Sequence, residues 1–186
     1  MKRVKYRGIG AAAAAVVVCA GAVAIPASGA DSSKPGHGGT AKIKMVVNDD
    51  GLVFTGPRKV ERGQRLKVVN RTFPGKVGPH TFTLLRKNRL PDTKREMKQC
   101  ENLKLALCEN IAKAHEFDPS TFVVNKPNVE VGRKGWDKAF GRTGDSWYTE
   151  KAGEHNTRRV SANDGRTLYY FCVVHPFMQG KIKVVK

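Results

Sequence analysis

Four side chains in the sequence could together bind a soft metal ion. Cys172, His175 and Met178 follow one another at intervals of three residues, in a loop that we expect between two strands. His80 stands directly before another expected strand, so it can point to the same end of a sandwich. A thiolate, two imidazoles and a thioether favour copper, because they suit both Cu(I) and Cu(II). Such a site can pass one electron with little rearrangement of its ligands.

Each of these side chains also has an ordinary structural explanation. Cys172 could be a small buried hydrophobic residue, the two histidines could be hydrogen-bonded core residues, and Met178 could belong to the core. Their combination at this spacing favours a metal site instead. Zinc fits less well, because methionine is a poor zinc ligand and the loop offers no further Cys, His or Asp. The sequence therefore predicts a copper site.

Alternation of apolar and polar residues predicts the strands that would hold these ligands. In the first strand, Ile43, Met45 and Val47 form the apolar face. We expect residues 71–79 to form a loop and residues 163–165 to form a turn. Many short strands separated by turns indicate a mainly β protein, either a sandwich or a small barrel. The alternating stretches are 42–47, 52–54, 66–68, 82–84, 168–173 and 181–185.

The first thirty residues are predicted to be a signal peptide rather than part of the fold. Residues 1–7 carry four basic side chains, residues 9–25 are apolar or small, and small residues precede Asp31. This pattern predicts cleavage near Ala30 and an exported protein, whether secreted, periplasmic or associated with the cell envelope. A retained membrane anchor is the alternative, but the apolar run is short for a span and rich in alanine.

The remaining 156 residues are enough for one domain with a sizeable core. Residues 31–41 are rich in Ser, Gly and Pro, and we expect them to form a flexible tether. The domain would then span residues 42–186.

If the protein is exported, its cysteines are expected to form disulfides. Three remain after cleavage, and in an oxidising compartment Cys100 and Cys108 are the natural pair, which leaves Cys172 free to bind a metal ion. Leu107 and Ile111 belong to a four-residue spacing that predicts helix, and that spacing also includes Leu103 and His115.

One continuous helix would conflict with that disulfide. It would hold Cys100 and Cys108 about 12 Å apart, whereas a disulfide needs Cα atoms within roughly 7 Å. Either the helix breaks or the bond does not form. We favour a break near Glu101–Asn102, which would give two short helices joined by the disulfide.

Two parts of the chain resemble a known family. The segment YYFCVVHPFMQGKIKVV is similar to the C-terminal end of the small blue copper proteins, the cupredoxins, and is closest to amicyanin and plastocyanin. Upstream, VERGQRLKVVNRT and GPHTFTLL resemble the strand and the histidine-bearing loop of that family. The resemblance covers residues 42–85 and 144–186.

The resemblance implies a cupredoxin-like Greek-key β-sandwich, interrupted by a helical and loop insertion at about residues 86–143. It implies one type 1 copper ion, a role in carrying single electrons, and no enzymatic activity. The implied ligands are His80, Cys172 and His175 in a plane, with Met178 axial. In the family the C-terminal histidine lies nearest the solvent, so electrons would leave near His175. The apolar residues around it would form an exit patch: Pro79, Pro176 and Phe177.

The chain departs from the family in two respects. The family often has Asn after its first histidine and Ser or Thr after its cysteine, hydrogen-bonded across the site, whereas this chain has Thr81 and Val173. Because hydrogen bonds around a site tune the metal, the family's reduction potential cannot be transferred. The insertion could be a partner-docking surface, a lid over copper, or decoration that covers a sheet edge, and we favour the last.

The net charge of +18 points to partners of opposite charge. We expect acidic protein redox partners, with an anionic cell-envelope surface as a further possibility, and a monomer. A nucleic-acid partner is not expected, because basic and aromatic residues do not interleave. A copper-delivery module and an interaction domain that uses the insertion are the alternative functions.

Other groups of reactive side chains are weaker candidates. His115 with Cys100 and Cys108 would be too spread along one helix to share an ion, so a core histidine beside a disulfide is favoured. His37 and His155 have no candidate partner nearby in the sequence. Enzymatic activity is not expected, because a copper ion with all its ligands from the protein leaves no open position for substrate.

Overall fold

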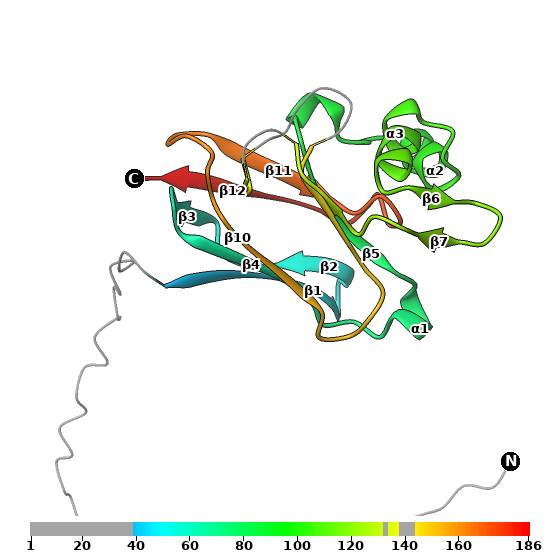
Figure 1. Ribbon diagram of the computed structural model, residues 1–186, viewed down its shortest axis with the longest axis horizontal. Coiled ribbons are helices and arrows are strands. Elements are labelled where there is room, and N and C mark those ends of the chain that lie inside the picture. Colours follow the sequence, from blue (N-terminus) through cyan, green and yellow to red (C-terminus); the bar gives the residue numbers. More distant parts are fainter. Residues whose placement is uncertain (1–38, 132–133, 138–143) are drawn as a thin grey trace, which may run out of the picture. The chain divides into compact units, whose positions relative to one another are not determined.

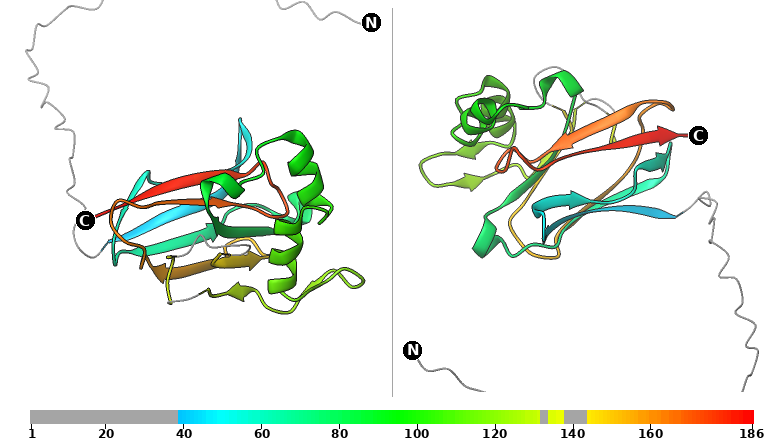
Figure 2. Two further views of the ribbon diagram at one scale, coloured as in Figure 1. Left: turned by 90° about the horizontal axis from the view of Figure 1, so that it is seen from above. Right: turned by 180° about the vertical axis from the view of Figure 1, so that it is seen from behind.

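The alternating stretches form two β-sheets whose apolar faces pack together. The computed structural model describes residues 39–131, 134–137 and 144–186. Figures 1 and 2 show the two layers. The predicted signal peptide and most of the predicted tether lie outside the described residues. Within the described part of the chain, no helix is long and apolar enough to cross a membrane.

The smaller sheet has four strands in the order β10-β4-β1-β2. Its members β1 and β4 are parallel, while the other two pairs are antiparallel. Ile43 and Met45 of β1 are buried, whereas Lys42 and Lys44 are exposed, which confirms the predicted alternation there. Val47 is 58% exposed, so its predicted place on the apolar face is wrong. The strands are β1 (Thr40–Asn48), β2 (Gly51–Thr55), β4 (Arg65–Asn70) and β10 (His155–Arg159).

The larger sheet has the order β3-β12-β11-β5-β9-β8 and contributes the other half of the core. Phe82 and Leu84 of β5, with Leu168 and Tyr170 of β11, pack against Ile43 and the other buried residues of the smaller sheet. The mainly β sandwich is therefore confirmed. The strands are β3 (Lys59–Glu61), β5 (His80–Leu85), β8 (Asn128–Val129), β9 (Ser146–Thr149), β11 (Thr167–Phe171) and β12 (Gln179–Val185).

The insertion contains the two predicted short helices. The helix α2 (Lys94–Glu101) begins at a capping box between Thr93 and Glu96, in which each side chain bonds the other's backbone N–H. The helix α3 (Ala106–Ala114) follows after a short linker. The break is where the sequence predicts it. Leu103, however, lies in the linker with a positive φ of 54° rather than on a helix.

A disulfide joins the two helices. Cys100 and Cys108 are bonded with their Cα atoms 5.2 Å apart, which confirms the predicted pair, and Cys172 is a free thiol. The bonded cysteines belong to a second apolar cluster, with Leu107 and Ile111 of α3 and with Leu85, Phe171 and Val173 of the larger sheet. The helices therefore cover the outer face of that sheet at β5 and β11 (Figure 1). These are interior strands, so the expectation that the insertion covers a sheet edge is wrong for the helices.

The remaining elements are short. A helical turn, α1 (Pro74–Val77), lies within the stretch that the sequence predicts as loop. A 3-10 turn, η1 (Lys87–Arg89), follows β5, and β6 (Phe117–Asp118) pairs with β7 (Val123–Val124) in a small hairpin beyond α3.

The disulfide should contribute measurably to stability. Replacing Cys100 and Cys108 together by alanine should lower the free energy of unfolding by about 2–3 kcal/mol, because the unfolded chain regains the entropy of an open loop. Denaturant unfolding of the oxidised protein and the variant measures this difference. Arg95→Ala, an exposed change on the same helix, is the control. An unfolding midpoint equal to that of the wild type would contradict the prediction.

Candidate metal centre

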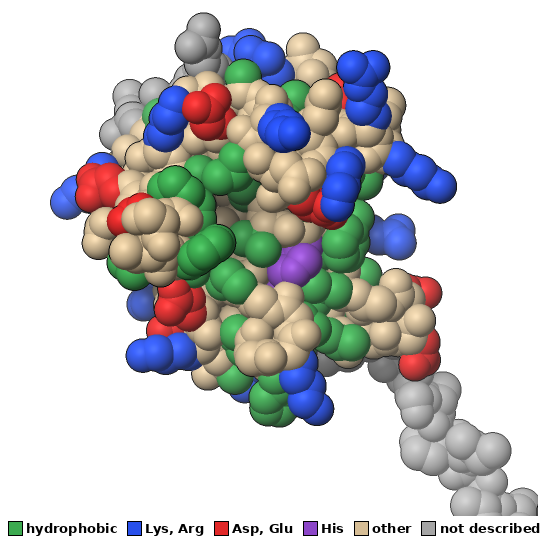
Figure 3. Space-filling model, turned by 90° about the vertical axis from the view of Figure 1, so that its right-hand side faces the viewer, with side chains coloured by type: hydrophobic (Ala, Val, Ile, Leu, Met, Phe, Trp, Pro, Cys, Tyr) green, Lys and Arg blue, Asp and Glu red, His purple; other side chains and the backbone are tan. Residues whose placement is uncertain are grey.

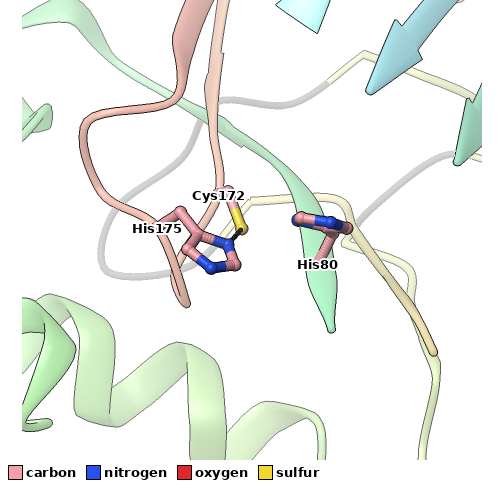
Figure 4. A group of neighbouring side chains, drawn as sticks. All are labelled: His80, Cys172 and His175. Atoms are coloured by element: carbon pink, nitrogen blue, oxygen red, sulfur yellow. Dashed lines mark hydrogen bonds between the residues drawn. The ribbon is translucent and has the colours of Figure 1, made fainter. Parts of the chain in front are cut away.

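The pairing of two neighbouring strands brings the predicted ligands together. The strands β5 and β11 are antiparallel, with Phe171 opposite Thr83, so the start of β5 lies beside the end of β11. His80 is the first residue of β5, and Cys172 directly follows β11. Residues 172–178, which we call the ligand loop, then lead into β12 and carry His175. Figure 4 shows His80, Cys172 and His175 converging at this end of the sheet.

Three of the four predicted ligands form a compact group. The candidate donor atoms of His80, Cys172 and His175 all lie within 4.8 Å of one another. Cys172 Sγ is 3.7 Å from His175 Nδ1, and the two imidazole centroids are 4.9 Å apart. His80 and Cys172 are fully buried, and His175 is half-buried. Among the described residues, this is the one cluster of His, Cys, Asp or Glu with the spacing of a metal site.

His80 is oriented by a hydrogen-bonded side chain behind it. The hydroxyl of Thr72 donates to Asn70 Oδ1 at 2.7 Å, so it accepts from His80 Nε2–H at 2.8 Å. That leaves the other ring nitrogen, Nδ1, with a lone pair, and it is buried with no hydrogen-bond partner in the described part of the chain. A buried unpaired acceptor costs about 1–3 kcal/mol. A metal ion bound at Nδ1 would remove that cost.

Both histidines are prepared to act as neutral ligands. Burial, with a smaller contribution from the charge of His175, lowers the pKa of His80 to about 4. Burial also lowers the pKa of His175, although a hydrogen bond to the backbone of Val77 opposes this effect. Both rings are therefore uncharged near pH 7, when a metal ion needs their lone pairs.

The thiol of Cys172 lacks a positive charge that would favour its ionisation. Complete burial raises its pKa, while hydrogen bonds from Thr81 and from the ligand-loop backbone lower it. The backbone N–H of Thr81 donates to Sγ at 3.2 Å. A cation between the sulfur and the two imidazoles would supply the missing charge. The donor set and its burial thus fit a soft metal ion.

Met178 is held close to the group through its backbone. Its N–H donates to the carbonyl of His175 at 2.8 Å, and its carbonyl accepts from the N–H of Cys172 at 3.0 Å. These two bonds close the ligand loop on itself, and the Met178 side chain is 1% exposed in the sandwich core. Gln179 fixes the loop further, since its side-chain amide donates to the carbonyls of Pro176 and Pro91.

Thr81 cross-links the site despite the apolar side chain at position 173. Its Oγ1 accepts from the backbone N–H of Val173 at 2.8 Å. Family members often have a hydrogen bond between two side chains across the site. In this chain the corresponding hydrogen bond joins the Thr81 side chain to the backbone of Val173. Val173 can consequently face the second apolar cluster without breaking the link between β5 and the ligand loop.

The predicted exit patch is only partly accessible. Phe177 is 52% exposed, and its ring centroid is 5.9 Å from that of His175. Pro79 is half-buried, but Pro176 is buried, so it does not contribute surface as the prediction requires. Figure 3 shows hydrophobic side chains around a histidine on this face of the molecule.

A groove of about 650 Å³ lies between the ligand loop and the insertion. Val174 of the loop lines it, together with residues of the insertion such as Leu103, Ile111 and Phe122. The insertion therefore adjoins the candidate metal centre.

The remaining histidines do not form a second cluster. His115 is buried and hydrogen-bonded to Ser146 Oγ and to the carbonyl of Lys126, each at 2.7 Å, as expected of a core histidine. His155 is exposed at the start of β10, and His37 lies outside the described residues.

The solved structures that are similar to this chain are distant from it in sequence. No protein-family model and no curated protein matches the chain. Among solved structures, auracyanin B has 13% identity and a TM-score of 0.40, covering 79% of this chain and 88% of its own. Auracyanin A, a "blue" copper protein from Chloroflexus aurantiacus, has 18% identity and a TM-score of 0.39, covering 79% and 98%. A purple cupredoxin from Nitrosopumilus maritimus has 14% identity and a TM-score of 0.38, covering 77% and 98%.

The sandwich itself brings a free thiol and two neutral imidazoles together at the sheet end where the sequence resembles cupredoxins. The two packed sheets and this donor set are the features that the resemblance implies.

Proposed function

We propose that this protein is an exported blue copper protein that binds one type 1 copper ion and carries single electrons between redox partners. The observation that carries the proposal is the buried lone pair of His80 Nδ1, which has no protein partner among the described residues and belongs to the group formed with Cys172 and His175. Met178 would be the fourth ligand, because its backbone bonds hold it beside Cys172 and His175.

The copper ion, when bound, would supply a one-electron couple between Cu(II) and Cu(I). The protein's own residues supply a rigid and dry site for it. Thr72 fixes the ring of His80, the N–H of Thr81 holds the sulfur of Cys172, and the hydrogen bonds within the ligand loop fix its shape. Burial of His80 and Cys172 keeps water away from the donor atoms. A site held in this way has little to reorganise when an electron arrives or leaves.

Electrons would enter and leave through the half-buried His175 and the exposed Phe177 beside it. Apolar surface at this position lets a partner approach without desolvating charges. The strongly basic composition supports an acidic redox protein as that partner. The signal-like N-terminus and the disulfide support a location outside the cytoplasm.

Copper binding is tested by titrating the purified protein with Cu(II) while recording its visible spectrum. An intense band should grow, saturate at one copper per chain, and bleach reversibly with a reductant. Cys172→Ser should abolish the band, because the thiolate is the source of the colour, whereas the exposed His155→Ala should leave it unchanged. A colourless wild-type protein, or tight copper binding without a reversible couple, would contradict electron carrying.

The exit route is tested by adding one charge at the surface. Phe177→Lys should slow electron self-exchange by about tenfold, because two copies would then meet with like charges at the contact. The visible band should not move, since Phe177 is not a ligand. Asn163→Lys, in the turn at the opposite end of β11, adds the same charge and should have little effect. Equal slowing in both variants would contradict this route.

A further inference from the structure

A buried asparagine lies behind the threonine that orients His80. Asn70 is the last residue of β4 and is fully buried, as is Thr72 two residues later. Asn70 Oδ1 accepts two hydrogen bonds from Thr72, one from its backbone N–H at 2.9 Å and one from its hydroxyl at 2.7 Å. The Thr72 hydroxyl is in turn 2.8 Å from His80 Nε2. Asn70 can therefore act on His80 through Thr72.

The other polar groups of Asn70 are held at the junction of β9 and β10. Its Nδ2 group donates to Thr149 Oγ1 at 3.5 Å, and the Thr149 hydroxyl donates to the Glu154 carboxylate at 2.8 Å. The backbone N–H of Asn70 donates to the carbonyl of Glu154 at 2.9 Å, and its carbonyl accepts from the N–H of Gly153 at 2.8 Å. Every polar group of Asn70 therefore has a protein partner, which fixes the position of its side chain.

The backbone N–H of Thr72 determines which way round the Asn70 amide lies. A backbone N–H can only donate, so the amide atom 2.9 Å from it is the oxygen. With the amide reversed, two donors would face each other at that distance. The longer bond to Thr149 agrees with this orientation, because Thr149 gives its hydroxyl hydrogen to Glu154 and its oxygen can accept from Nδ2.

The oriented amide fixes the hydrogen of the Thr72 hydroxyl and, through it, the tautomer of His80. Asn70 Oδ1 has no hydrogen to give, so its 2.7 Å contact requires Thr72 to donate. A hydroxyl has a single hydrogen, so Thr72 accepts from His80 and Nε2 carries the hydrogen. Since burial lowers the pKa of His80 to about 4, the ring is neutral near pH 7 and its Nδ1 holds a lone pair.

We propose that Asn70 is a positioning residue for the copper site: acting through Thr72, it keeps hydrogen off His80 Nδ1 and so keeps that nitrogen ready to bind the metal. The inference rests on the proposed copper function. Without the Asn70 oxygen, the Thr72 hydroxyl can turn and donate to Nε2, and the hydrogen of the neutral ring then belongs on Nδ1. A metal ion can bind Nδ1 of that tautomer only after the hydrogen has moved, because a ligand nitrogen must offer its lone pair.

The number of unpaired buried groups shows why the other tautomer gains population when the Asn70 oxygen is removed. If Nε2 kept its hydrogen, the Thr72 hydroxyl hydrogen would lose its acceptor and the Nδ1 lone pair would still have no partner in the described part of the chain. If Thr72 donated to Nε2 instead, only the hydrogen on Nδ1 would be unpaired. In the wild type the Asn70 oxygen reverses this preference, because turning the Thr72 hydrogen away would leave two oxygen lone pairs facing each other at 2.7 Å.

The first test measures the tautomer itself and needs no metal. Nitrogen NMR of the full-length, metal-free protein at pH 7 reports which ring nitrogen of His80 carries hydrogen. Asn70→Leu keeps the branched shape without the oxygen, whereas Asn70→Asp keeps an oxygen at Oδ1. Hydrogen on Nε2 is expected in the wild type and in Asn70→Asp, with a substantial population on Nδ1 in Asn70→Leu. Hydrogen on Nδ1 in the wild type, or on Nε2 alone in folded Asn70→Leu, would overturn the inference.

The second test measures the affinity for Cu(II). Asn70→Leu should weaken binding by about tenfold, the usual size of effect when a group that orients a metal-binding histidine is lost. Asn70→Asp should restore most of the affinity. In a Thr72→Val background the hydroxyl that transmits the effect is gone, so adding Asn70→Leu should weaken binding no further. Equal affinities of the wild type and Asn70→Leu, or losses that add in the double variant, would contradict an action through Thr72.

Asn156→Leu is the matched control. It makes the same substitution on β10, the neighbour of β4 in the smaller sheet, but its amide donates to Asn128. The wild-type tautomer and affinity are expected for this variant. An equal loss of affinity in Asn156→Leu, or a loss in Asn70→Leu without a change of tautomer, would overturn this inference alone. A wild-type protein that takes up no copper would overturn the proposed function and the role of Asn70 with it.

Discussion

The antiparallel pairing of β5 with β11 is the constraint on which the site depends. It sets the first residue of one strand beside the end of the other, and so it places His80 against Cys172. It also fixes which side chains of β5 face the core. A slip of one residue would exchange the threonines with Phe82 and Leu84 and would turn every side chain of the strand to the other face. The same register thus serves both the core and the ligands.

That arrangement has a cost in the metal-free protein. Two neutral imidazoles and a protonated thiol are buried together, and one ring nitrogen has no partner among the described residues. Thr72 does not relieve this cost, because it bonds the other ring nitrogen of His80, and Thr81 bonds only the sulfur of Cys172. They hold the ligands in place instead. Metal binding would then release a proton from the thiol and stabilise the fold at the same time.

The sequence predicts structure best where residue type and spacing alone determine it. The alternation in β1 predicts its buried face at Ile43 and Met45, and the distance limit on a disulfide predicts the break between α2 and α3. Val47 and Leu103 depart from these patterns because each lies where its element gives way to a turn. Whether a residue is at an element's end depends on the packing around it, which spacing alone does not reveal.

Other features had little or no sequence signal. The sequences of β9 (SWYT) and β10 (HNTRR) lack an apolar alternation. These segments are strands because they pair with neighbouring strands in the two sheets. Threonine and serine occur throughout the sequence, so nothing marks Thr83 and Ser146 as partners. They meet across two strands, and His115 reaches Ser146 from 31 residues away. Reading such contacts requires the register of β5 with β9.

The insertion lies between two strands that are neighbours in the sheet, so elements can be gained or lost there. The strands β5 and β9 are adjacent and antiparallel, so the whole segment between them is topologically the connecting loop of one hairpin. Helices, a disulfide and a small hairpin can be acquired or lost there without altering the order of any strand in the sandwich. The sandwich can therefore keep its strand order while this connecting segment changes. Because His115 contacts Ser146 of β9, such changes also meet the sheet that holds His80.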